Sequence, residues 1–261
     1  MTPENLLHHY DKASLWPAAS GLDVPAAYQS ALAVRRLRTA RGEMPRGYKI
    51  GFTNRSIWPR YNVDAPIWGT VWDTTLTFCE GDSVLSLAGI CQPRLEPEAV
   101  FGMAVTPPAG ASLEELFACI AWVAPGFEIV QSHQPDWKFG AADTVADGAL
   151  HARLLVGRRV PIVEVAQDAA GFEQRLAAAG VTLYCGNKAV ERGVGAHVMD
   201  GPLHALRHFH QTMRECPGAP GLQPGDVVTT GTWTDAWPVT PGERWMAAFD
   251  PPLSPLTVSF S

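Results

Sequence analysis

The sequence of 261 residues lacks the features of several protein classes. It has no basic excess, since 20 Lys and Arg residues stand against 26 Asp and Glu residues, for a net charge of −6. A main partner that is nucleic acid or an anionic membrane would call for a basic face, so we expect neither. No apolar run approaches the roughly 20 residues that a membrane-spanning helix needs.

The five cysteines include no CxxC pair, and the first residues carry acids and histidines where a signal peptide would have a basic and then an apolar stretch. An unpatterned, odd set of cysteines indicates reduced thiols. The absence of a signal-peptide pattern points the same way. We therefore expect an intracellular, cytoplasmic protein.

What is present is a composition typical of a packed globular chain, with 46% hydrophobic and 18% charged residues. Residues 1–45 are predicted to be helical, with a helix that starts near Asp23 and ends at Gly42. Ser112–Glu115 forms a capping-box pattern that predicts a helix through Trp122. Further helices are predicted over residues 168–179 and 202–215.

Short β-like runs separated by Gly, Pro and Thr turns dominate residues 48–105. More strands are predicted at residues 127–130, 226–230 and 256–260. The pattern indicates an α+β fold, in which a helical N-terminal segment (1–45) precedes a strand-rich body (46–261).

The segment around Glu96 and Glu98 carries the strongest chemical signal. Side chains alternate across a strand, so both carboxylates point to one face. Two neighbouring carboxylates repel unless a cation lies between them or one is protonated. Pro97 between them suits an edge or irregular strand position.

A third carboxylate, Glu128, lies in an apolar predicted strand. Three carboxylate ligands favour a hard divalent ion, Mg²⁺ or Mn²⁺, and leave positions for water and substrate. The alternative is that Glu96 and Glu98 are exposed strand residues and that Glu128 is ion-paired. Spacing alone does not decide between the two interpretations.

Five segments resemble the 2-oxopent-4-enoate hydratases and 4-oxalocrotonate decarboxylases of the fumarylacetoacetate hydrolase superfamily. Gly47–Asn54 resembles a GYKIGLTS segment, and Trp68–Asp73 looks like a YGxLxD segment. Glu96–Glu98 is similar to a metal-binding ExE pair. The others are similar to GIEIVxS…DWKxG and PGDxVxTGT segments, and they lie at Gly126–Val130 with Asp136–Gly140, and at Leu222–Thr232.

The resemblance implies a mixed β-roll with a metal site at its open mouth, like the C-terminal domain of fumarylacetoacetate hydrolase. It also implies roles for individual residues, with Mg²⁺ or Mn²⁺ chelating the substrate. The implied groups are the metal ligands Glu96, Glu98 and Glu128, the acid/base pair Lys49 and Asp73, and the substrate-carboxylate donors Thr230, Gly231 and Thr232. We expect Lys49 to be tuned towards neutrality by the nearby carboxylate and ion.

Two departures leave the substrate open. Residues 146–152 read ADGALHA where the hydratases have ADNASS, so we expect His151 either to contact substrate or to bond the backbone. Asp235 stands where a glycine is usual. Lys138 either lies over its aromatic neighbours or supplies charge to the substrate carboxylate. Tryptophans near these segments are expected mainly in the core, with some forming an apolar wall for a bulky substrate tail.

The resemblance implies hydration of a small 2-hydroxy-2,4-dienoic (2-oxo-enoic) acid to a 4-hydroxy-2-oxo acid, by an enzyme expected to form a homo-oligomer. A vinylogous 2-oxo acid decarboxylase is the first alternative. The second is an acylpyruvate C–C hydrolase, whose branch usually has Asp at the position of Glu128. The third is a non-catalytic partner subunit, which the presence of Lys49, Asp73 and the three glutamates disfavours.

Overall fold

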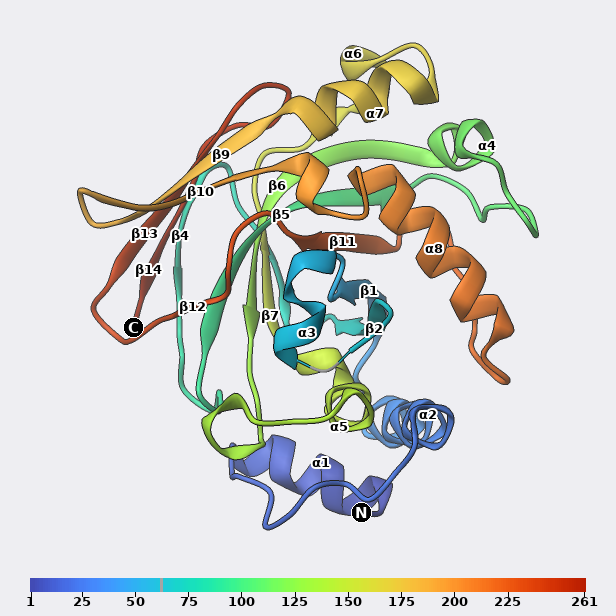
Figure 1. Ribbon diagram of the computed structural model, residues 1–261, viewed down its shortest axis with the longest axis vertical. Helices are drawn as coiled ribbons and strands as arrows, with labels where there is room; N and C mark the ends of the chain where they lie inside the picture. Colours follow the sequence, from blue (N-terminus) through green and yellow to red (C-terminus); the bar gives the residue numbers. More distant parts are fainter. Residues whose placement is uncertain (62) are drawn as a thin grey trace.

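A computed structural model describes residues 1–61 and 63–261 (Figure 1). The helices are α1 (Pro3–Lys12), α2 (Val24–Ala40), α3 (Trp58–Tyr61), α4 (Leu113–Ala118), α5 (Ala141–Ala146), α6 (Ile162–Val165), α7 (Ala169–Ala178) and α8 (Pro202–Glu215). The strands are β1 (Pro45–Gly51), β2 (Ile67–Trp72), β3 (Leu76–Phe78), β4 (Asp82–Leu85), β5 (Arg94–Met103), β6 (Ile120–Val130), β7 (His151–Val156), β8 (Val160–Pro161), β9 (Gly180–Cys185), β10 (Lys188–Val194), β11 (Val227–Thr232), β12 (Trp237–Pro238), β13 (Arg244–Phe249) and β14 (Leu256–Phe260). Among these described residues, no helix is both long and apolar enough to cross a membrane.

Two sheets form the body of the molecule. The larger has the order β2-β1-β11-β5-β6-β7-β3, and the smaller has the order β10-β9-β13-β14-β4. The β1–β11 and β3–β7 pairs are parallel, whereas β5 pairs antiparallel with both β11 and β6. The larger sheet curls so far that β2 contacts β7, although four strands separate them in the sheet order. This mixed, rolled sheet with helices confirms the expected α+β fold.

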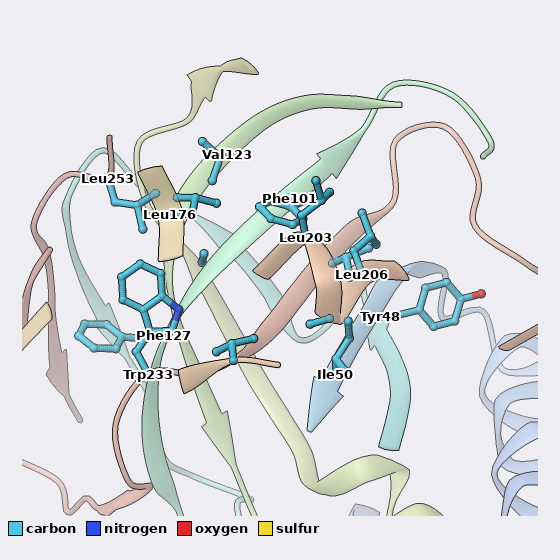
Figure 2. Close-up of a cluster of buried hydrophobic side chains, with 14 of the residues drawn as sticks. Tyr48, Ile50, Phe101, Val123, Phe127, Leu176, Leu203, Leu206, Trp233 and Leu253 are labelled. Atoms are coloured by element: carbon cyan, nitrogen blue, oxygen red, sulfur yellow. The ribbon is translucent and has the colours of Figure 1, made fainter. Parts of the chain in front are cut away.

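The main apolar core lies where the strands of the roll meet α7, α8 and the smaller sheet (Figure 2). Phe101 of β5, Phe127 of β6 and Trp233 are completely buried in it. Helix α8 presents Leu203, Leu206 and Phe209 to the same core, at the spacing of one helical face. Burial of each such side chain stabilises the fold by roughly 1.5–3 kcal/mol.

The N-terminal helices form a second packed layer, which Figure 1 shows beside α5. Asp23 caps α2 by accepting a 2.8 Å hydrogen bond from Ala26 N, and a proline follows in the first turn, as the sequence predicts. Leu6 and Ala27 pack in one buried cluster with Ile67 of β2 and Val145 of α5. The helical segment therefore supports the β-roll from outside.

One predicted boundary is wrong. Ser112 does cap α4 with a full capping box, but that helix ends at Ala118, and residues from Ile120 onward form β6 instead of a helix through Trp122. Strand β6 pairs with β5 along almost its whole length and is buried on both faces. That strand pairing outweighs the local helical pattern. The strand also accommodates Pro125, whose carbonyl oxygen accepts a 2.8 Å hydrogen bond from Gly157 N.

Candidate active site

Three carboxylates converge on one face of the β5–β6 pair. In the antiparallel register Glu96 lies directly opposite Glu128, and Glu98 follows on the same face of β5. One oxygen atom from each of the three side chains lies within 4.8 Å of the others. The expected same-face arrangement of Glu96 and Glu98 is confirmed, and the strand pairing adds the third glutamate.

The buried Glu98 carboxylate is held from one side. Gly231 N donates a 2.7 Å hydrogen bond to Glu98 Oε2, while Glu98 Oε1 has no hydrogen-bond partner among the described residues. Gly231 has φ of 107°, and a Cβ there would lie 1.8 Å from Thr53 Oγ1, so only glycine fits. The fixed carboxylate thus leaves one buried oxygen free to bind a ligand.

Burial and mutual repulsion give these carboxyl groups unusual acidities. Burial, with repulsion by Glu128, raises the pKa of Glu96 to about 7 and the pKa of Glu98 well above its ordinary value. The pKa of Glu128 is lowered, because Lys49 and His151 outweigh its burial. Three clustered carboxylates with an unpaired buried oxygen have the hard oxygen-donor chemistry of a Mg²⁺ or Mn²⁺ site, so the residues fit the expected ion.

Lys49 reaches the cluster from β1, across the interior of the roll. Its Nζ lies 3.1 Å from Glu128 Oε2, and both side chains are almost completely buried. Burial acts to lower the pKa of Lys49, but Glu128, Glu96 and Glu98 outweigh it and raise that pKa. Without an ion, the carboxylates therefore favour the ammonium form, whereas the tuning towards neutrality is expected beside a bound divalent ion. A divalent cation held by the same carboxylates would oppose their field.

His151 lies behind Glu128 and acts on that residue. Its Nδ1 is 2.9 Å from Glu128 Oε1, and its Nε2 is 2.8 Å from Thr75 Oγ1. Burial lowers the pKa of His151, and the neutral ring donates from Nδ1 to the Glu128 carboxylate, with Nε2 in contact with the Thr75 hydroxyl. Because both nitrogens are occupied, the structure replaces the expected substrate contact with a bond that orients a metal-ligand candidate.

A pocket reaches the carboxylate cluster at Glu96, and Lys49, Glu96 and Thr232 line it. The Thr232 hydroxyl, however, donates a 2.9 Å hydrogen bond to Thr234 O. The hydroxyl of Thr230 likewise donates 2.9 Å to Ala99 O. The amide of Gly231 is used by Glu98, so neither group offers the substrate donor that was expected.

Two further candidates lie away from the cluster. Asp73 lies in the turn after β2, at the opposite end of that strand from Gly69, which pairs with Lys49. Its Oδ1 accepts bonds from Met44 N at 2.9 Å and Thr74 N at 3.0 Å. The structure therefore does not bring Asp73 to Lys49 as an acid/base partner.

Lys138 is the second candidate residue that lies away from the carboxylate cluster. Its side chain is 82% exposed, and its Nζ lies 3.5 Å from Asp136 Oδ2. It lines a shallower depression beside the pocket, not the pocket itself. A cation so exposed acts on a substrate carboxylate weakly, because water screens it.

Sequence reasoning missed the aromatic part of the pocket. Phe52, Tyr61, Trp137 and Phe139, called the aromatic wall below, line the same pocket as Lys49 and Glu96. Three of the four lie inside the segments that carry the family resemblance, but tryptophans elsewhere were the expected wall. Trp233, for example, is buried in the main core. No periodic signal marks the wall, because its residues come from chain turns that only the fold brings together.

Comparison with known proteins identifies sequence relatives of this chain. No family model matches it. It is 32% identical over 228 residues to a 2-hydroxyhexa-2,4-dienoate hydratase of Comamonas testosteroni, covering 86% of this chain and 81% of that one. It is 28% identical over 230 residues to a 4-oxalocrotonate decarboxylase of a Pseudomonas species, covering 87% and 84%.

A solved structure supports the fold independently. The 4-oxalocrotonate decarboxylase of Pseudomonas putida G7, complexed with magnesium and adipate, matches 99% of this chain and 95% of that one with a TM-score of 0.87 at 24% identity. The fumarylpyruvate hydrolase of Pseudomonas aeruginosa, with Mn²⁺ and pyruvate, matches 82% and 88% with a TM-score of 0.61 at 16% identity. The chain belongs to the 2-hydroxydienoate hydratase and 4-oxalocrotonate decarboxylase branch of the fumarylacetoacetate hydrolase superfamily.

Proposed function

We propose that this protein is a divalent-metal-dependent hydratase that converts a 2-hydroxy-2,4-dienoate into a 4-hydroxy-2-oxo acid. The observation that carries the proposal is the cluster of Glu96, Glu98, Glu128 and Lys49, of which Glu96 and Lys49 line the pocket. The 32% identical relative is named a hydratase of this class. In the reaction water supplies a hydroxyl to C4, C3 and C5 each gain a hydrogen, and the 2-hydroxyl becomes a ketone.

Glu96, Glu98 and Glu128 would hold the ion. When bound, Mg²⁺ or Mn²⁺ supplies the positive charge that fixes the substrate's carboxylate and 2-oxygen and favours enolate character. Gly231 N holds Glu98, and His151 holds Glu128, so two of the ligands are oriented in advance. The pre-oriented ligands lower the cost of organising the site during the reaction.

Lys49 is the proton carrier of the proposal. Among the described residues that line the pocket, Lys49 is the one with a positively charged side chain. Its ammonium form can deliver a proton to the distal carbon of the diene. Its Nζ is kept in place by Glu128, and β1 fixes its backbone between β2 and β11.

Decarboxylation is the second candidate, because a 28% identical relative carries that name. A dicarboxylic substrate would bring a second carboxylate, and the described lining of the pocket offers it no cation apart from Lys49. Asp235 adds negative charge to the same lining. Hydration of a monocarboxylate therefore fits the pocket better.

The deciding experiment measures the purified protein with Mg²⁺, with Mn²⁺, and with chelator on three substrates. Hydration of 2-hydroxypenta-2,4-dienoate should appear as loss of the dienol absorbance with a product 18 mass units heavier, an expectation from the stoichiometry of adding one water. Metal-dependent CO₂ release from 2-oxohex-3-enedioate, or cleavage of an acylpyruvate, without any hydration would reject the proposal. Glu98→Gln serves as the inactive control.

Two finer points belong to the same proposal. All five cysteines, each in the described part of the chain, are free thiols, which supports a reducing, cytoplasmic location. We also propose a homo-oligomer, as the family resemblance implies. Light scattering coupled to size exclusion gives the subunit number directly, and a monomer at all concentrations would contradict it.

A further inference from the structure

We infer that the preferred substrate carries a neutral, bulky apolar group, best an aromatic ring, on C5 of the dienoate. The inference rests on the proposed function and names the substrate class of the same pocket. Its basis is the aromatic wall, which lines the same pocket as Glu96 and Lys49. A substrate whose carboxylate end is held at the carboxylate cluster would extend its distal carbon along this wall.

The wall residues pack against each other and still face open space. The Tyr61 and Phe139 rings stack with centroids 5.5 Å apart at 17°, and Phe52 lies 5.6 Å from Tyr61 and 6.2 Å from Phe139. The Trp137 ring meets Phe139 edge-on at 6.0 Å. All four remain partly exposed. A partly exposed aromatic cluster in a pocket offers stacking and edge contacts to another ring.

The backbone around the wall is strained. Phe52, Trp137, Ala149 and Leu150 all line the pocket and have φ of 55°, 59°, 56° and 65°. Non-glycine residues rarely adopt this left-handed region, and for a bulky residue it is a true outlier. Such strain persists where the surrounding structure imposes it and clusters at binding sites. The apolar lining is therefore a built feature.

Charge at the pocket rim disfavours an acidic tail. Arg60 is occupied by Asp235, with Nη1 3.5 Å from the carboxylate, and Arg94 lies 4.2 Å over the Trp137 ring. Lys138 lies beside Asp136. The described lining of the pocket itself contains Asp235 and no cation apart from Lys49, so a second carboxylate would find no further positive charge in that lining. A neutral tail needs no such charge.

The space beside the wall extends beyond the pocket. Tyr61, Trp137 and Phe139 also line the adjoining open depression, which has a volume of about 580 Å³. Ile57 and Ile67 extend the apolar lining beyond the four aromatics. A short dienoate would leave this lining in contact with water, whereas an aryl group would cover it.

Binding can be tested without turnover. In the presence of Mg²⁺, calorimetry compares 2-oxo-5-phenylpentanoate with 2-oxopentanoate, which keep the chelating end but lack the double bond that is hydrated. We expect the phenyl compound to bind at least tenfold more tightly. With 2-hydroxy-5-phenylpenta-2,4-dienoate and 2-hydroxypenta-2,4-dienoate, kcat/KM should favour the phenyl substrate by a similar factor. Equal affinity, or preference for the short compounds, would overturn the inference.

Variants locate the effect. Phe139→Ala should reduce the phenyl preference to about threefold or less, and the milder Phe139→Leu, together with Tyr61→Leu, covers the case in which the alanine variant does not fold. The matched control is Phe78→Ala, since Phe78 is 46% exposed on β3 and contacts Trp122 instead of the pocket. Phe78→Ala should keep the full preference. Equal losses in the pocket variants and in the control would contradict a role for the wall.

The preference for a phenyl tail and the hydratase reaction can be disproved separately. If the protein turns over the short dienoate well and the phenyl compounds poorly, the tail is wrong while the hydratase stands. If neither dienoate is hydrated but the phenyl 2-oxo acid still binds with metal, the reaction is wrong while the tail preference stands.

Discussion

The two ends of the pocket are built in opposite ways. The carboxylate end uses regular strands, where the β5–β6 register sets Glu96 against Glu128, and backbone or side-chain donors hold Glu98 and Glu128. The aromatic wall uses the end of β1, short helices and left-handed backbone. Groups that hold an ion must keep a fixed geometry, which strands provide. Groups that select a tail can vary without disturbing it, which suits loops.

The largest effect on the difference between the two ends of the pocket is expected when one carboxylate is removed. Glu98→Gln should abolish turnover and weaken Mg²⁺ or Mn²⁺ binding by more than about 100-fold, since loss of a ligand should exceed the 10–100-fold effect of losing an outer partner. Calorimetric titration with Mn²⁺ measures the affinity. Glu114→Gln, at an exposed position of α4, is the matched control.

Glu98→Gln should also change the thermal stability of the metal-free protein, and in the opposite direction to its effect on ion binding. Because burial and repulsion raise the pKa of Glu98, its ionised form destabilises the metal-free fold, and Glu98→Gln should raise the melting temperature measured with chelator. A lower Tm with chelator would mean that the carboxylate serves the fold and not an ion.

The next effect separates chemistry from ion binding. Lys49→Met should lower kcat by about 10²- to 10⁴-fold, the usual contribution of a general acid or base. Metal affinity should stay the same or improve, because the variant removes a cation 3.1 Å from Glu128. Wild-type kcat in Lys49→Met would assign proton transfer to another group.

Replacement of His151 is expected to have an effect of intermediate size on metal binding. His151→Ala should weaken metal binding by about 10- to 100-fold, the effect of losing the partner that orients a ligand. Thr75→Val, which removes the hydroxyl bound to His151 Nε2, should cause a smaller loss in the same direction. If His151→Ala changed KM for substrate and left Mn²⁺ affinity unaltered, His151 would be a substrate contact after all.

The smallest effect is expected at Asp73. Asp73→Asn keeps an oxygen that can accept the bond from Met44 N, and the residue lies at the far end of β2 from the pair Lys49 and Gly69. We expect kcat/KM within about threefold of wild type, because no contact in the pocket changes. Steady-state kinetics on the same dienoate provides the measurement, and a 100-fold loss would restore Asp73 as an acid/base group.

Local signals predicted much of the secondary structure. Asp23 and Asp168 cap their helices through side-chain oxygens, and α8 spans Pro202–Glu215 as its pattern predicts. The prediction failed after α4, where the capping box was read correctly but the partner strand of Ile120–Val130 was not visible. Strand pairing is a long-range interaction, so a local window cannot anticipate it. The division between residues 45 and 46 into two segments stays a prediction.

The sequence by itself determined the carboxylates, because strand alternation forces Glu96 and Glu98 onto one face whatever the rest of the chain does. The sequence did not determine which other residues lie next to these carboxylates in the folded protein. In a flat sheet β1 would lie about 14 Å from β6, at roughly 4.8 Å per strand, yet Lys49 touches Glu128 because the sheet curls. That curl also gathers Phe52, Tyr61 and Phe139 around one space. Distances across a rolled sheet depend on all its strands together, so only the tertiary structure could set them.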